Sequence, residues 1–175
     1  TGIKAISDND VRMGILPKLL SMKCPVGVTV YNSAGEIMAY ESQQTTTFNT
    51  QGINSANSDV VSWISDEGEK VFFIPFGSDA SLAQIEAYDY GTMTFSIALV
   101  DALTSQPTEV KTFENVSLYP EKEFSVELSN YVSIADTKLL IVENGSVVGE
   151  VNELSPLLKS VAIDNSTISY GSPSI

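Results

Sequence analysis

Carboxylates are the main acid and base groups of this 175-residue chain, because it contains 22 Asp and Glu residues and no histidine. Without an imidazole, neither a Ser-His-Asp or Cys-His catalytic centre nor a histidine-ligated zinc site can form. Two carboxylates at the right separation suffice for glycoside hydrolysis. The densest group is Asp66, Glu67 and Glu69, in an expected hairpin turn where acids are ordinarily solvated. The sequence therefore predicts no catalytic residue, with a carboxylate-pair hydrolase as the third hypothesis for function.

The same turn is the candidate metal site. Hard oxygen donors on a loop suit calcium, so Asp66, Glu67 and Glu69 are predicted as calcium ligands, against the alternative of a solvated turn. Asp8-Asn9-Asp10 begins like an EF-hand loop, but Met13 and Leu19 stand where that loop requires Gly and Glu. No cofactor other than this candidate calcium ion is expected.

Aromatic and amide side chains are the candidate ligand-binding groups. Trp63 is a candidate platform for stacking of sugar rings, together with Tyr31, Tyr40, Tyr88 and Tyr90. Trp63 also lies between Val61 and Ile64 in an apolar run, which favours packing in the core or across strands. The polar loop 42–59 carries amides of the kind that bind hydroxyls or peptide backbone, against the alternative of a solvated loop. These candidates are Gln43, Gln44, Asn49, Gln51, Asn54 and Asn57.

Composition excludes several partners. The net charge of −13 repels a phosphate backbone, so nucleic acid is not an expected partner. No apolar run approaches the roughly 18 residues that span a bilayer, so membrane insertion is not expected. The single Cys24 excludes an internal disulfide and is predicted to be a buried structural thiol. Abundant Ser, Thr and Asn with few Lys indicate an extracellular or cell-surface protein, the alternative being an unusually acidic cytoplasmic one.

Hydrophobic periodicity gives the elements. Val11, Ile15, Leu19 and Met22 recur at helical spacing and predict one helix over 7–22, kinked by Pro17. From Cys24 onward the period is two. Four hairpins are then expected, in each case two strands around a turn. Their turns are Asn32-Ser33-Ala34-Gly35, Asp66-Glu67-Gly68-Glu69, Asp89-Tyr90-Gly91 and Asn144-Gly145.

These short strands predict an all-β fold, an antiparallel β-sandwich of Ig-like or jelly-roll-like type with one short N-terminal helix. Three segments are expected. Residues 1–23 form an N-terminal helix or linker, residues 24–153 form the β-sandwich module, and residues 154–175 form a further linker.

Several separated motifs resemble an accessory module of large secreted proteins from Gram-positive, clostridia-like bacteria. They are the strand opened by Cys24-Pro25-Val26, the strand end Phe73-Ile74-Pro75 and the strand start Gly91-Thr92-Met93, within about residues 24 to 129. The resemblance implies a position behind a hydrolase domain, often of the α/β-hydrolase or lipase type. Residues 160–170 resemble the opening strand of a bacterial Ig-like repeat, which implies that a further domain begins there.

The expected function is a non-catalytic accessory, spacer or binding module of a secreted or cell-surface bacterial protein attached to a hydrolase. The alternative is a carbohydrate-binding module that uses Trp63 and the polar loop 42–59. The expected partners are the neighbouring domains of the same polypeptide, and a glycan or a surface protein.

Overall fold

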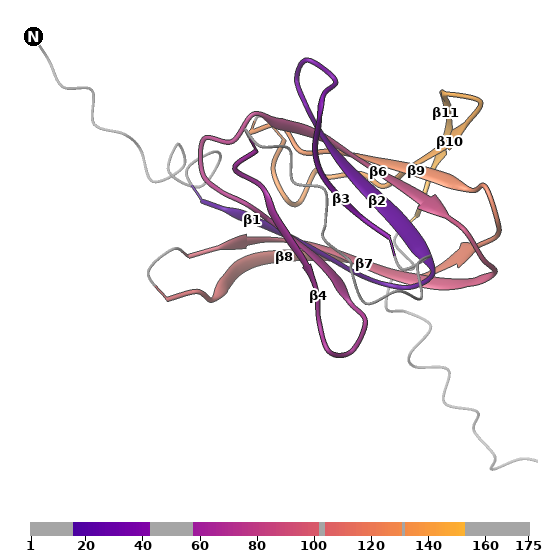
Figure 1. Ribbon diagram of the computed structural model, residues 1–175, viewed down its shortest axis with the longest axis horizontal. Coiled ribbons are helices and arrows are strands. Elements are labelled where there is room, and N and C mark those ends of the chain that lie inside the picture. The colour runs from indigo at the N-terminus through magenta and orange to yellow at the C-terminus, as the bar shows by residue number, and fades with distance from the viewer. Residues whose placement is uncertain (1–15, 43–57, 102–103, 131, 153–175) are drawn as a thin grey trace, which may run out of the picture.

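The computed structural model describes residues 16–42, 58–101, 104–130 and 132–152. In this part of the chain all regular elements are strands, and they form two antiparallel sheets packed in a sandwich-like arrangement (Figure 1). One sheet has five strands in the order β4 (Val61–Ile64), β5 (Lys70–Ile74), β1 (Lys18–Lys23), β7 (Gly91–Val100) and β8 (Pro107–Leu118). The other has six, in the order β11 (Ser146–Glu150), β10 (Leu140–Glu143), β9 (Glu123–Glu127), β6 (Ala80–Ala87), β2 (Val26–Asn32) and β3 (Ile37–Glu41). The predicted all-β class is confirmed.

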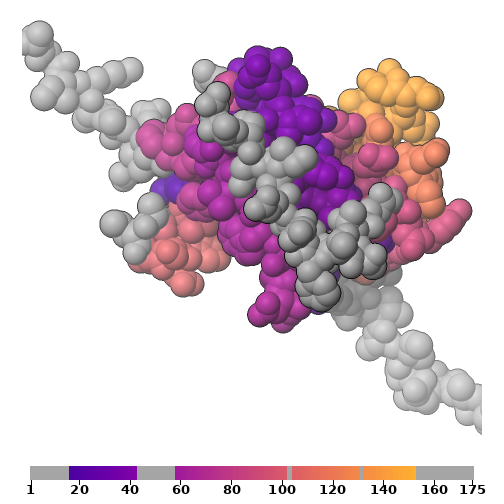
Figure 2. Space-filling view, in the orientation of Figure 1, coloured from indigo at the N-terminus to yellow at the C-terminus, as the bar shows by residue number. Residues whose placement is uncertain are grey.

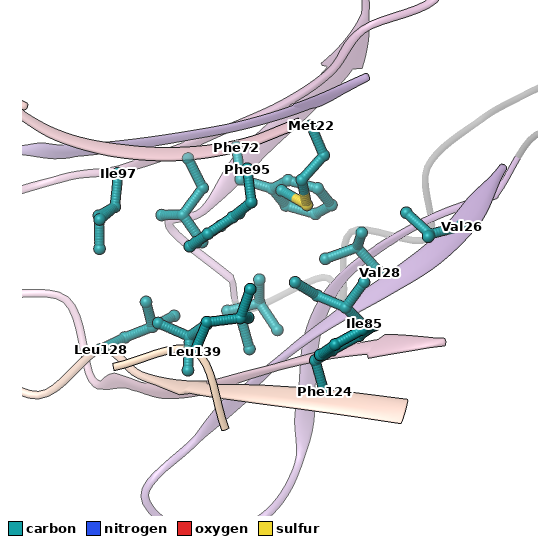
Figure 3. Packing of buried hydrophobic residues seen from close by; sticks show 14 of the residues in the cluster. Met22, Val26, Val28, Phe72, Ile85, Phe95, Ile97, Phe124, Leu128 and Leu139 are labelled. Atoms are coloured by element: carbon teal, nitrogen blue, oxygen red, sulfur yellow. The ribbon is translucent and has the colours of Figure 1, made fainter. Parts of the chain in front are cut away.

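The core lies between the inner faces of the two sheets (Figure 3). Met22, Phe72 and Phe95 extend from the five-stranded sheet toward Ile85 and Phe124 of the six-stranded sheet, and all five side chains are fully buried. This arrangement follows from the period-two alternation of the strands, which places every second side chain on one face. The alternate side chains therefore form the two outer faces, where a ligand can reach them.

The predicted helix over 7–22 is wrong where the structure describes it, because Lys18–Lys23 is the strand β1. β1 is the central strand of the five-stranded sheet, between β5 and β7. Leu20 and Met22 are fully buried, whereas Leu19 and Ser21 face outward and are half-buried. Pro17 lies just before β1 and disfavours a helix through this point. The rest of the predicted helix, residues 7–15, lies outside the described residues.

Three of the four predicted hairpins are confirmed. β2 pairs with β3, β4 with β5, and β10 with β11. In the last of these, Asn144 and Gly145 have φ values of 50° and 74°, as a two-residue turn of type I′ requires. Phe76, which continues the alternation of Phe72 and Ile74 in the sequence, lies beyond β5 and is exposed. Residues 43–57 of the polar loop lie outside the described residues.

The predicted hairpin around Asp89-Tyr90-Gly91 is wrong, because β6 and β7 lie in different sheets. β6 pairs with β2 and β9, whereas β7 pairs with β1 and β8. The backbone N–H of Tyr88 donates to the Pro25 carbonyl at 3.2 Å, which holds the end of β6 beside β2. Alternation predicts which side chains of a strand face inward, but two strands that face each other across a core show the same pattern as two paired strands.

Buried polar groups connect the two sheets near Cys24. The Lys70 ammonium of β5 donates to the Cys24 carbonyl at 3.0 Å, and the Ser62 hydroxyl of β4 donates to the Glu41 carboxylate of β3 at 2.8 Å. Burial lowers the pKa of Lys70 and raises the pKa of Glu41. Burial also raises the pKa of the Cys24 thiol to about 12, so this thiol is protonated and unreactive at neutral pH. In the described part of the chain, no helix has the length and apolar character needed to cross a bilayer.

Candidate functional site

Of Trp63 and the six predicted loop amides, only Trp63 lies within the described residues. Trp63 lies on β4, an edge strand of the five-stranded sheet, and 43% of its surface is exposed. Of the two expected arrangements, packing in the core or across strands, the register agrees with the second, since Trp63 lies opposite Val71 on the neighbouring strand. The amide candidates of the polar loop lie outside the described residues; they are Gln43, Gln44, Asn49, Gln51, Asn54 and Asn57.

The predicted calcium ligands lie in the turn between β4 and β5. The Glu67 carboxylate is 3.5 Å from the Lys23 ammonium, in a pair of exposed side chains. The backbone N–H of Glu69 donates to the Ser65 hydroxyl at 3.1 Å, which shapes the turn. Within the described ranges, no three acidic or cysteine side chains converge on a point that could hold a metal ion. The structure therefore adds no support for calcium at Asp66, Glu67 and Glu69.

Tyrosines gather instead on the outer face of the six-stranded sheet. Tyr31 of β2, Tyr40 of β3 and Tyr88, which follows β6, line one concavity of about 160 Å³. We refer to this concavity as the tyrosine groove. The remaining lining residues are small or polar; they are Gly27, Thr29, Ser42, Gln84 and Glu86. The alternation of β2 and β6 explains this grouping, since the inward partners Val26, Val28 and Ile85 are fully buried.

The groove exists because a glycine forms part of its floor. Gly27 pairs with Glu86 of β6, and a Cβ at Gly27 would lie 3.7 Å from the Ser42 hydroxyl and 3.8 Å from Cε2 of Tyr40. These are ordinary van der Waals distances, so a Cβ at Gly27 would touch Ser42 and Tyr40 without displacing them. Glycine weakens a strand interior and often marks a position where another molecule approaches closely. Gly27 therefore supplies depth between Tyr40 and Glu86.

The polar groups of the groove are suited to hydroxyl recognition. Tyr40 lies opposite Thr29, and Thr29 lies opposite Gln84, so three strands present polar side chains in one row. Burial raises the pKa of Tyr88, with smaller contributions from Cys24, Asp89 and Tyr40. Its phenol is therefore protonated at neutral pH and can donate a hydrogen bond. The Gln84 amide both donates and accepts, whereas the Glu86 carboxylate accepts.

The three tyrosines of the groove were candidate ligand-binding residues from the sequence, whereas Gly27, Thr29, Gln84 and Glu86 were not. Their signal is present in the sequence, because all four occupy outward positions of alternating strands. What the sequence does not show is that β2 and β6 are neighbours, since residues 33–79, with β3, β4 and β5, lie between them in the chain. Tyr90, the fourth tyrosine considered, is 75% exposed at the corner before β7 and does not line the groove.

Comparison of the chain with protein-family models, with curated proteins and with solved structures finds no match.

Proposed function

We propose that this chain is a non-catalytic binding module that recognises carbohydrate through the tyrosine groove of the six-stranded sheet. The observation that carries the proposal is the convergence of Tyr31, Tyr40 and Tyr88 around the floor made by Gly27. Aromatic rings offer apolar faces to the C–H surfaces of a sugar ring, and their hydroxyls reach its polar edge. Gln84 and Glu86 supply the amide and carboxylate that bind ring hydroxyls.

The size of the groove favours a ligand of which only one unit enters the groove. A volume of about 160 Å³ is smaller than the roughly 300–1,000 Å³ of typical small-molecule pockets. A sugar ring that is part of a longer glycan can occupy such a groove while the rest of the chain lies across the sheet.

This proposal places the module in a secreted or cell-surface bacterial protein, next to a hydrolase domain on the same polypeptide. The motif resemblance and the composition support that context, and the outer face of the six-stranded sheet supplies the binding role. An Ig-like or jelly-roll-like classification of the sandwich is part of the same proposal. The module concentrates its neighbouring domain on a glycan surface and leaves the chemistry to that domain.

Paired alanine substitutions test the proposal. A glycan array identifies a bound oligosaccharide, and calorimetric titration of the full chain then measures its affinity. Tyr40→Ala is expected to weaken binding about threefold to tenfold, because it removes one aromatic contact. Trp63→Ala, on the opposite sheet, is the matched control and is expected to leave the affinity unchanged. The proposal is wrong if no glycan binds, or if Trp63→Ala weakens binding and Tyr40→Ala does not.

A further inference from the structure

A second depression adjoins the tyrosine groove on the same sheet. It has a volume of about 580 Å³ and is lined by the turn between β8 and β9, by the start of β9 and by the end of β10. Glu86 lines both concavities, so the two are adjacent on this sheet. The β2–β3 turn and the β10–β11 hairpin, which lie at opposite ends of this sheet, are separate projections of the molecule (Figure 2).

The strand register shows the direction of this surface. Gly27 of β2 lies opposite Glu86 of β6, Glu86 lies opposite Glu123 of β9, and Glu123 lies opposite Val142 of β10. Four adjacent strands therefore contribute one residue each to a row that crosses the sheet. With about 4.8 Å between neighbouring strands, the row is about 14 Å long. A linear ligand that enters the tyrosine groove can continue along it into the second depression.

Four of the ten residues that line the second depression are glutamates, and one is a lysine. Glu86, Glu121, Glu123 and Glu143 all face it, with Tyr119 as an exposed aromatic side chain at its wall. Lys122 also lines the depression. Its ammonium group donates to the Ser117 carbonyl at 2.8 Å and lies 5.0 Å from the centroid of the Tyr119 ring. Lys122 is therefore held against the protein. The field at this end of the row attracts a cation and repels an anion.

We infer that the ligand is a linear chain of amino sugars whose free ammonium groups lie in the second depression while one ring occupies the tyrosine groove. The inference depends on the proposed carbohydrate-binding function and names the class of glycan. The tyrosine groove and the register row determine where the chain lies, and the carboxylates determine its charge. A chain of uronic acids or sulfated sugars would place its own anions beside Glu123 and Glu143 and is excluded by repulsion.

Three oligosaccharides of equal length test this inference on the full chain. They are a β-1,4 chain of glucosamine with free amines, the same chain N-acetylated, and a chain of galacturonic acid. At low ionic strength the free-amine chain is expected to bind about fivefold tighter than the N-acetylated chain. The difference is expected to shrink as salt is added, since exposed charges are screened. The galacturonic acid chain is expected not to bind.

Charge-neutralising variants test which carboxylates cause the preference for the free-amine chain. Glu143→Gln and Glu123→Gln are each expected to weaken binding of the free-amine chain more than binding of the N-acetylated chain, which lowers the ratio of the two affinities. Glu109→Gln, which removes an exposed carboxylate from β8 of the other sheet, is the matched control and is expected to leave that ratio unchanged.

Two results would separate this inference from the proposed function. If the N-acetylated chain binds as tightly as the free-amine chain and Tyr40→Ala weakens both, the carbohydrate-binding function stands and the amino-sugar inference is overturned. If none of the chains binds and a glycan array is also blank, the proposed function fails, and the inference fails with it.

Discussion

The two outer faces of the sandwich differ in chemistry although both sheets follow the same alternation. On the five-stranded sheet an apolar row crosses all five strands in register, from Val61 through Phe73, Leu19 and Ala98 to Val110. On the six-stranded sheet an outward row in register carries the polar side chains Tyr40, Thr29 and Gln84. The strands of the five-stranded sheet contain no tyrosine. The two outer faces therefore differ along these rows: the row is apolar on the five-stranded sheet and polar on the six-stranded sheet.

A substitution in the core is expected to have the largest effect on the free energy of unfolding, because both sheets pack against the core. Phe95 is fully buried and stacks on Phe113 with 5.9 Å between ring centroids. Phe95→Ala is expected to lower the free energy of unfolding by about 3–5 kcal/mol, because it leaves a cavity between the sheets. Denaturant unfolding measures this loss. Thr94→Ala, at the exposed neighbouring position, is the control; a similar loss in both variants would contradict the assignment of inner and outer faces.

Filling the groove is expected to affect binding without affecting the fold. Gly27→Val places a β-branched side chain, favourable in a strand, on the floor of the groove in contact with Ser42 and Tyr40. Glycan affinity is expected to fall about tenfold, by about 1.4 kcal/mol, while the midpoint of thermal unfolding changes little. Gly149→Val, on β11 of the same sheet and outside the groove, is the matched control. Equal affinities of the two variants would show that the floor of the groove does not contact the ligand.

The apolar face is expected to respond in the opposite way. Phe73 is half-buried on β5, between Val61 of β4 and Leu19 of β1. Phe73→Ala is expected to lower the free energy of unfolding by about 1 kcal/mol and to leave glycan affinity unchanged. Parallel unfolding and binding measurements on one preparation test this. A loss of affinity at unchanged stability would place the binding surface on the five-stranded sheet instead.

The smallest expected effect concerns the buried carboxylate that connects β3 to β4. Burial raises the pKa of Glu41, against the opposing influence of the Ser62 hydrogen bond and the Lys70 charge. A carboxyl whose pKa is higher in the folded than in the unfolded protein stabilises the fold as it becomes protonated, and this contribution is lost as the pH rises through the folded pKa. Glu41→Gln mimics the protonated form and is expected to raise the unfolding midpoint at pH 7.

The pH series separates this effect from a general loss of negative charge. The advantage of Glu41→Gln is expected to vanish below about pH 4, where the wild-type carboxyl is protonated in both states. Glu109→Gln on exposed β8 corrects for reduced net repulsion in the chain. Circular dichroism melts between pH 3 and pH 8 measure the difference. A lower midpoint for Glu41→Gln at pH 7 would show that its attraction to Lys70 outweighs the cost of burial.

The sequence predicts the fold class well because alternation and turn chemistry are local. The strands around Asn144-Gly145 follow directly from the positive φ values that such a turn requires. The position of β6 next to β2 does not follow, because neither its own alternation nor the corner at Tyr88 shows which sheet a strand joins. Short apolar runs also remain ambiguous in period, which explains why β1 was predicted as helix.

The candidate site was predictable only in its residue types. Tyr31, Tyr40 and Tyr88 were considered with Trp63 as one aromatic platform, yet the sandwich separates Trp63 from them by placing β4 in the other sheet. The outward position of Gly27 follows from the alternation of β2, but its place on the floor of a groove depends on Tyr40 and Ser42, which the sequence does not place beside it. Sites that combine outward residues of non-consecutive strands need the strand order before they can be recognised.

Chemical-shift mapping during titration with a bound glycan shows which outer face binds the glycan, because it reports both faces in one experiment. The backbone amides of Gly27, Thr29, Gln84 and Glu86 are expected to shift with saturating dependence on ligand concentration. The indole N–H of Trp63, on the five-stranded sheet, is expected not to move. A shift of the Trp63 indole with no change at Gly27 or Glu86 would contradict the assignment of the binding face.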